Sequence, residues 1–163
     1  MITDALEEIR KMEYEVELEK NPGKRKGMQE EIRRKIGEIY KRVEKELDQL
    51  FPRIFEGEES RELVEIAEAL GCYLAKNKLT TSQIRNVYAR VKEGLGREEI
   101  DMLRPLLAYA AARHSSVKPL QRVLDKALQK IPREEENYKK YYKKFRDFFQ
   151  AILAYHRYYG GKE

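Results

Sequence analysis

The 163-residue sequence has no tryptophan, a single cysteine, two histidines and no long apolar run. Because Cys72 has no second cysteine to pair with, an internal disulfide is excluded and a reducing compartment is favoured. No segment approaches the roughly 20 consecutive apolar residues needed to cross a bilayer. The N-terminus also lacks the basic and apolar regions of a signal peptide. We therefore expect a cytoplasmic protein without membrane contact.

Patterns that support catalysis or metal binding are missing as well. The sequence has no histidine, cysteine and carboxylate cluster with metal-ligand spacing, no glycine-rich phosphate loop and no nucleophile elbow. His156 falls within an apolar helical stripe and is expected to be a buried histidine with a hydrogen-bond partner. His114, next to Arg113, fits a helix cap or a phosphate contact equally well. Cys72 is expected to be a small core residue, so the sequence predicts a protein that is not an enzyme and needs no cofactor.

Apolar residues recur at helical spacing along most of the chain, although 39% of residues are charged and the mean hydropathy is −0.80. No segment of useful length alternates as a strand would. We therefore predict an all-α fold, a helical bundle of six or seven helices in a single domain. Residues 1–57 form an N-terminal helical pair in this prediction, and residues 58–163 form the rest of the bundle. Helices are expected over 4–20, 28–51, 60–74, 80–92, 97–113, 117–131 and 134–159.

The helix expected over 80–92 has the clearest start. Thr80 and Gln83 have the spacing of a capping box, and Leu79 and Ile84 have that of a hydrophobic staple.

The helix expected over 28–51 carries a long apolar stripe and ends before Pro52. About 26 residues at 1.5 Å each reach roughly 40 Å, which is longer than a compact bundle of this size needs. Part of the stripe is therefore a candidate for self-association, and a helix curving over its own core is equally compatible with it. The candidate residues are Met28, Ile32, Ile36, Ile39, Val43 and Leu47.

Aromatic residues of the last helix share one side, with lysines and Arg157 outside that stripe. This arrangement favours a buried core over a surface for stacking RNA bases. Only Tyr158 clearly leaves the stripe. The stripe contains Tyr138, Tyr141, Tyr142, Phe145, Phe148, Phe149, Tyr155 and Tyr159.

Charge is unevenly distributed, although the net charge is only +5. Residues 69–92 and 102–124 contain no carboxylate, while a solvated surface normally mixes signs. We interpret these stretches as the footprint of a polyanion, with a plain solvated surface as the alternative. Such cations contact phosphates without reading bases, and charge alone leaves RNA and DNA both open. The candidates are Arg85 and Lys92 on one helix flank, Lys118, Arg122 and Lys126 on one ridge, and Arg104 and Arg113.

Three segments carry a family resemblance. They are Leu79-Thr-Thr-Ser-Gln-Ile-Arg85, Leu103-Arg-Pro-Leu-Leu-Ala-Tyr109 with Arg113, and Phe148-Phe-Gln-Ala-Ile-Leu-Ala-Tyr-His-Arg-Tyr-Tyr-Gly160. Together they resemble the small helical subunit of the type III-A (Csm) CRISPR effector complex. The resemblance extends over about 63–161, and residues 1–57 match it less clearly.

The resemblance implies a compact helical bundle that is not an enzyme. Several copies would stack beside the backbone subunits and line the groove that holds guide RNA and target RNA. Target cleavage would belong to the backbone subunit, and DNA cleavage and cyclic oligoadenylate synthesis to the large subunit. Sequence specificity would come from guide–target pairing. A head-to-tail stack requires two different complementary patches, for which the acidic first helix and Glu58, Glu59, Glu62 and Glu65 are candidates.

Two other functions fit parts of the sequence. The helices expected over 60–74 and 80–92, with a turn at Asn77, resemble a DNA-binding helix-turn-helix that would place Arg85, Asn86 and Arg90 in the major groove. A helical adaptor that forms a homodimer through the 28–50 stripe, without nucleic acid, is the other alternative.

Overall fold

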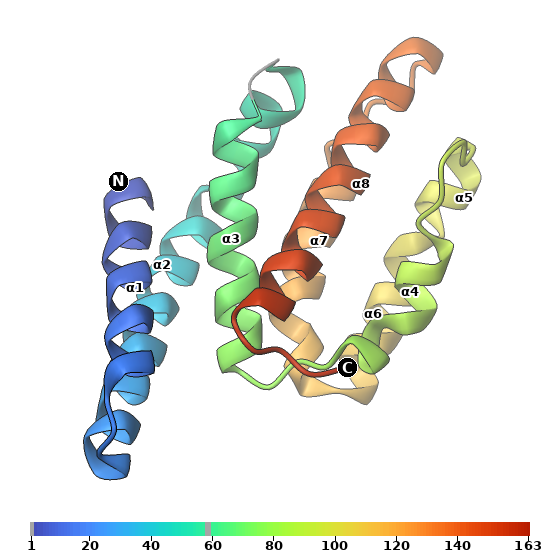
Figure 1. Ribbon diagram of the computed structural model, residues 1–163. Helices are drawn as coiled ribbons and strands as arrows, with labels where there is room; N and C mark the ends of the chain where they lie inside the picture. Colours follow the sequence, from blue (N-terminus) through green and yellow to red (C-terminus); the bar gives the residue numbers. More distant parts are fainter. Residues whose placement is uncertain (1, 58–59) are drawn as a thin grey trace.

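The computed structural model describes residues 2–57 and 60–163, and over these residues the fold is all-α. The prediction of a helical bundle is confirmed. Its helices are α1 (Ile2–Leu18), α2 (Pro22–Glu56), α3 (Arg61–Lys76), α4 (Arg85–Arg90), α5 (Arg97–Asp101), α6 (Leu103–Arg113), α7 (Lys118–Gln129) and α8 (Glu135–Tyr158), with short 3-10 turns η1 (Thr81–Ile84) and η2 (Ser115–Val117). Figure 1 shows α1 at one edge of the array, α3 and α8 at its centre, and α4, α5 and α6 at the other edge.

The first two helices form a hairpin whose turn is set by Asn21 and Pro22. The Asn21 side chain accepts a hydrogen bond from the Lys24 N–H at 3.1 Å, and Pro22 occupies the first turn, where its missing N–H costs nothing. The second helix therefore begins six residues before Met28, where the apolar stripe starts.

The same helix continues past Pro52 to Glu56, whereas the sequence predicted an end before this proline. Proline removes one helical hydrogen bond, but the next turn buries Ile54 and Phe55 completely or nearly so. Burial of two such side chains is worth roughly 3–6 kcal/mol. This gain exceeds the cost of the proline, so the helix runs on.

The stripe proposed for self-association lies inside this chain. Ile32, Ile36, Ile39, Val43 and Leu47 are at most 4% exposed, and Met28 packs against the same core. Because α2 is covered by α1 and α3, the stripe presents no exposed apolar face to a second copy. Its length is explained by the second possibility, a long helix lying over its own core.

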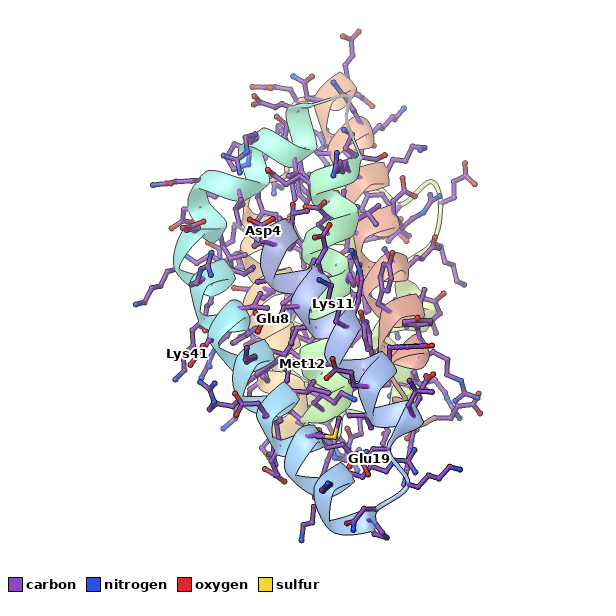
Figure 2. The ribbon with its side chains drawn as sticks, turned by 60° about the vertical axis from the view of Figure 1, so that its left-hand side comes forward. Asp4, Glu8, Lys11, Met12, Glu19 and Lys41 are labelled. Atoms are coloured by element: carbon purple, nitrogen blue, oxygen red, sulfur yellow. The ribbon has the colours of Figure 1, made fainter. Side chains whose placement is uncertain are left out.

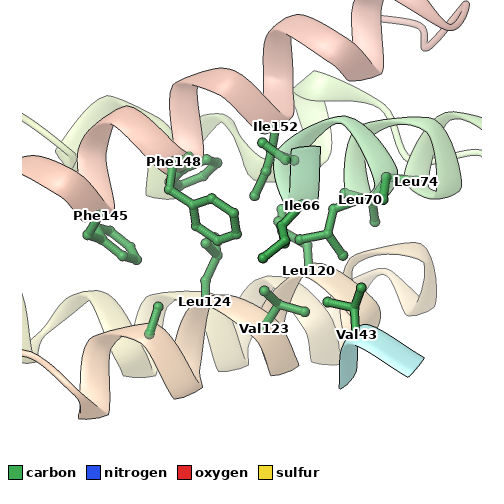
Figure 3. Packing of buried hydrophobic residues seen from close by; sticks show 14 of the residues in the cluster. Val43, Ile66, Leu70, Leu74, Leu120, Val123, Leu124, Phe145, Phe148 and Ile152 are labelled. Carbon is green, nitrogen blue, oxygen red and sulfur yellow. The ribbon is translucent and has the colours of Figure 1, made fainter. Parts of the chain in front are cut away.

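One core joins the two parts of the chain. Val43 from α2, Leu70 from α3, Leu124 from α7 and Phe148 from α8 lie close together in Figure 3. The α2 helix contacts α3, α7 and α8. Residues 2–57 and the following bundle are therefore packed as one body.

The most extensive helix–helix contact is between α3 and α8, and it depends on Gly71. A Cβ at Gly71 would lie 2.6 Å from the Tyr155 Cβ and 2.7 Å from both the His156 N and the Ile152 O. These distances are below normal contact, so the two backbones can approach this closely only with glycine in that position. The neighbouring Cys72 is buried, and burial raises the pKa of its thiol to about 12. Cys72 is thus a core residue, as predicted.

The aromatic stripe of α8 is buried as predicted, except that Tyr155 is only partly buried. Phe145, Phe148 and Phe149 have no exposed surface, while Tyr158 is 77% exposed. The last helix therefore holds the bundle together with its aromatic side and presents its lysines to solvent.

Polar contacts attach α1 to the same two helices. Arg10 donates two hydrogen bonds to the Glu68 carboxylate on α3, at 2.6 and 3.0 Å, and the Tyr159 hydroxyl donates a third at 2.6 Å. Burial alone would raise the pKa of the Glu68 carboxyl, but the hydrogen bonds from Arg10 and Tyr159 lower it below its usual range. Figure 2 shows α1 lying across α2 and α3, with the acidic residues Asp4 and Glu8 on this side of the molecule.

The segment 80–92 is a 3-10 turn followed by a short α-helix, and not the single helix that the sequence predicted. Half of the expected capping box is present, since the Gln83 side chain accepts a hydrogen bond from the Thr80 N–H at 3.0 Å. Ile84 then leaves helical geometry, with φ −117° and ψ 11°, and α4 ends at Arg90. Lys92 therefore lies beyond the helix on which it was predicted to share a flank with Arg85.

Candidate nucleic-acid interface

Several chain segments meet at one end of the bundle. The Thr81 N–H donates to the Lys162 carbonyl at 3.0 Å, and the buried His156 contacts the Leu79 carbonyl through Nε2 at 2.6 Å. Gly161 lies against the His156 ring, where a side chain would overlap it. Figure 1 shows the C-terminus beside the turn that leads from α3 into η1. His156 is thus the buried, hydrogen-bonded histidine that the sequence predicted.

The junction between α6 and α7 is fixed to the same end. The Ser116 hydroxyl donates to the Gln83 side-chain oxygen at 2.7 Å, so this oxygen accepts from both Ser116 and Thr80. The two segments predicted to bear cations, before α4 and before α7, are therefore held together by Gln83.

Five exposed cations surround this end, and we call them the basic end. Arg85 follows η1, Arg113 ends α6 and Lys118 begins α7. Lys78 follows α3, and Lys162 lies next to Thr80. Within residues 2–57 and 60–163, none of these five side chains forms an ion pair with a carboxylate. The nearby Arg157 is not one of the five, because it pairs with Glu163.

Lys78 and Lys162 were missed by the sequence analysis. Lys78 lies inside the carboxylate-free stretch 69–92, but nothing in the local pattern shows that it approaches Arg113 in space. Lys162 lies beyond the last helix and is brought to this end by the bridge between Lys162 and Thr80.

Three other predicted cations have acidic partners that lie far away in sequence. Arg104 donates to Asp125 at 2.7 Å, Arg122 lies 3.9 Å from Glu44, and Lys126 lies 3.6 Å from Asp48. Glu44 and Asp48 belong to α2, which packs against α7. The ridge of Lys118, Arg122 and Lys126 is therefore partly neutralised, and of its three cations only Lys118 belongs to the basic end.

Lys92 is exposed and has no carboxylate partner in the described part of the chain, but it stands apart from the basic end. Its carbonyl accepts a hydrogen bond from the Tyr142 hydroxyl at 2.7 Å. This contact fixes the backbone where the chain leaves α4, on the side that faces α8.

The exposed face of α6 adds an aromatic group. Tyr109 is 61% exposed, and the Arg113 guanidinium lies 5.9 Å from the centre of its ring. An arginine stacked on a tyrosine retains donors for a phosphate, and the free face of the ring is open to a base.

The acidic residues proposed for subunit contacts have mixed positions. Glu62 pairs with Arg53 at 2.7 Å, and Glu65 accepts hydrogen bonds from Thr3 and Arg61. Glu58 and Glu59 lie outside the described residues. Exposed carboxylates without an ion-pair partner in the described part of the chain are found on α1, among them Glu7 and Glu15.

Within the described ranges, no group of three or more histidine, cysteine, aspartate or glutamate residues could hold a metal ion. No described helix is both long and apolar enough to span a bilayer. The α4 helix has six residues, fewer than two turns, so Arg85 and Asn86 lie in its first turn and Arg90 ends it.

These features define a class of protein, a small all-α subunit that offers a charged surface and one continuous core. Residues 57–162 match the family model described as Csm2 Type III-A. The match spans more than half of the chain, so the chain belongs to the Csm2 family, the structural small subunit of the type III-A CRISPR complex, and it associates with other Csm subunits. A comparison with curated proteins found no match. The matched range agrees with the 63–161 range of the resemblance. It includes all five residues of the basic end, but of residues 1–57 it includes only Gly57.

Proposed function

We propose that this Csm2 subunit binds guide RNA and target RNA through sequence-independent phosphate contacts at the basic end, and that it is not an enzyme. The observation that carries the proposal is the gathering of five exposed cations without acidic partners in the described chain, in the part that matches the family. A surface of this kind neutralises phosphates and reads no base edges. We also propose that the protein is cytoplasmic, because its proposed target RNA is a transcript.

We divide six of the seven predicted RNA-binding residues into two groups, according to whether a carboxylate lies within ion-pair distance. The seventh, Lys92, stands apart from the basic end. Arg85, Arg113 and Lys118 have no carboxylate partner in the described chain, so a phosphate can bind them without breaking an ion pair. Arg104, Arg122 and Lys126 must first give up or share a carboxylate. Their contribution to RNA affinity should therefore be smaller.

Lys118 and Arg122 provide a matched comparison, since they lie one turn apart on α7 and are both exposed. We expect Lys118→Gln to weaken binding of a guide–target duplex more than Arg122→Gln, because Glu44 already offsets the Arg122 charge. Fluorescence anisotropy with labelled RNA measures both affinities. A larger loss for Arg122→Gln would contradict the division into two groups.

The double variant Arg85→Gln/Lys118→Gln tests the surface as a whole. It should lower RNA affinity and reduce the dependence of log K on log salt by on the order of 1–2. Lys11→Gln/Lys41→Gln removes the same charge on the α1–α2 side, where both residues are seen in Figure 2, and should leave the affinity nearly unchanged. Equal losses in the two double variants would reduce the proposal to a net-charge effect.

Sequence independence is tested with scrambled RNA at the same salt concentration. Similar affinities are expected, because phosphates are the same in every sequence. A strong preference for one sequence would favour a regulator that reads bases.

For its contacts with neighbouring subunits, we propose the outer face of α1, which meets a basic protein surface. Tyr14 and Leu18 are each 62% exposed on α1, next to Glu7 and Glu15. Figure 1 shows α1 at the opposite edge of the array from α4 and α6, which carry Arg85 and Arg113, so RNA and a subunit can be bound together.

Glu7→Lys/Glu15→Lys should lower the amount of this chain retained in a reconstituted complex. Glu93→Lys/Glu98→Lys, the same charge reversal at two exposed residues near the start of α5, is the control. Unchanged stoichiometry in Glu7→Lys/Glu15→Lys would exclude the outer face of α1.

A further inference from the structure

A surface hollow lies between the end of α3, η1 and the junction of α6 and α7, and we call it the Lys78 hollow. Basic and neutral polar groups line it, and no carboxylate does. Its lining includes Lys78, Gln83, Arg113, Ser115 and Ser116.

The Lys78 backbone is unusual. With φ +67°, Lys78 is the only residue other than glycine in the described chain to have positive φ. It ends α3 in a turn in which the Lys78 N–H donates to Ala75 and the Leu79 N–H donates to Leu74. Glycine is the residue that such a turn favours, because any Cβ is strained there. The chain therefore has a lysine ammonium at the rim of the hollow where glycine would fit better.

Donors face the hollow from three further positions. The oxygen of Gln83 accepts from Thr80 and Ser116, which fixes the amide and leaves its NH₂ group without an acceptor among the described residues. Arg113 contributes a planar guanidinium, which suits a phosphate. Ser115 also lines the hollow, and its hydroxyl is a further donor.

Two cations, an amide NH₂ and a hydroxyl, with no carboxylate to compete, match an oxyanion in both charge and hydrogen bonding. We propose that the Lys78 hollow is a pocket for a single phosphate group and that it seats one backbone phosphate of the bound RNA. The second part of this proposal rests on the RNA-binding function proposed above. The pocket would fix the register of the strand at the basic end, while the surrounding cations hold it less specifically.

The left-handed backbone gives an unusual test, because the charge and the strain can be removed separately. Lys78→Gly removes both, and Lys78→Gln removes only the charge. Both variants should lose RNA affinity on the order of tenfold, as expected for one charge-assisted hydrogen bond. Because only glycine relieves the backbone strain, Lys78→Gly should unfold at a higher temperature than Lys78→Gln. Lys78→Arg keeps the charge and should retain RNA affinity. If Lys78→Gly and Lys78→Gln bind RNA as the wild type does, the pocket is excluded.

Titration of the full chain with inorganic phosphate at constant ionic strength distinguishes the pocket from RNA binding in general. In ¹⁵N–¹H spectra, saturable shifts are expected at Ser115, Ser116 and the Gln83 side chain in the wild type, and not in Lys78→Gln. No shift at these groups would overturn the phosphate pocket even if Arg85→Gln/Lys118→Gln weakens RNA binding. Shifts together with an absence of RNA binding would retain the pocket for free phosphate and overturn its assignment to the RNA backbone.

Discussion

The close contact between α3 and α8 predicts that alanine has opposite effects on stability at two glycines, Gly71 in α3 and Gly37 in α2. Gly71→Ala should destabilise the protein, although alanine is the better helix former by about 1 kcal/mol. The added Cβ meets the Tyr155 Cβ, the His156 N and the Ile152 O at 2.6–2.7 Å. Because two of these atoms belong to the backbone, no side-chain rotation relieves the overlap, and α8 must move away from α3.

Overpacking of a core usually costs 1–3 kcal/mol, and an overlap with backbone belongs at the upper end of that range. After the gain in helix propensity is subtracted, we expect a net loss of roughly 1–2 kcal/mol. For a chain of this size, the melting temperature should fall by roughly 2–8 °C.

Gly37→Ala in α2 is the matched control. A Cβ there lies 3.9 Å from its nearest neighbour, the Tyr73 Cε1, which is ordinary contact. Only the propensity term remains, so the melting temperature should rise by roughly 2–4 °C. Thermal unfolding followed by circular dichroism at 222 nm measures both variants. If Gly71→Ala is as stable as Gly37→Ala, the reasoning about close backbone contact is refuted.

Three further changes test the packing and the buried carboxylate. Phe149→Ala should cost roughly 3–5 kcal/mol in urea unfolding, and a near-neutral value would place the aromatic stripe outside the core. Pro52→Ala should add on the order of 1–3 kcal/mol by restoring an N–H that can donate to the Asp48 carbonyl; a loss would show that the ring packs usefully. The pKa of Glu68 is lower when the protein is folded, so its contribution is complete above the unfolded value of about 4.3 and is lost as the pH falls. Glu68→Gln should therefore flatten the acid side of a plot of melting temperature against pH, and an unchanged slope would refute the role of the Arg10 contact.

Helical periodicity was sufficient to predict the fold class and most of the core. The stripe of α8 and the small residues of α3 are buried as their spacing indicated, because a helix side with apolar residues every three or four positions must face other side chains. The bounds were less predictable. Pro52 is an interior residue of α2, since burial of Ile54 and Phe55 outweighs the local preference of proline.

The candidate site was less predictable than the fold, because charge along the sequence does not show charge across a helix–helix contact. The stretch 102–124 contains no carboxylate, yet Arg122 within it lies near Glu44, and Lys126 just beyond it lies near Asp48. Both carboxylates belong to a helix more than 70 residues earlier. Lys78 was missed for the converse reason. The position of Lys78 beside Arg113 depends on the left-handed turn after α3, and no residue pattern in the sequence predicts that turn.

The segments that carried the family resemblance turn out to hold one another in place. His156 in the third segment contacts Leu79 in the first, and Tyr88, which follows the first segment, lies edge-on to Phe149 in the third. The first and third segments are therefore joined by packing contacts, and the exposed Arg85 projects from the structure that they build. It also follows that replacing Arg85 or Lys118 should leave the fold intact, so a loss of RNA binding in those variants can be assigned to charge, provided that their unfolding curves match that of the wild type.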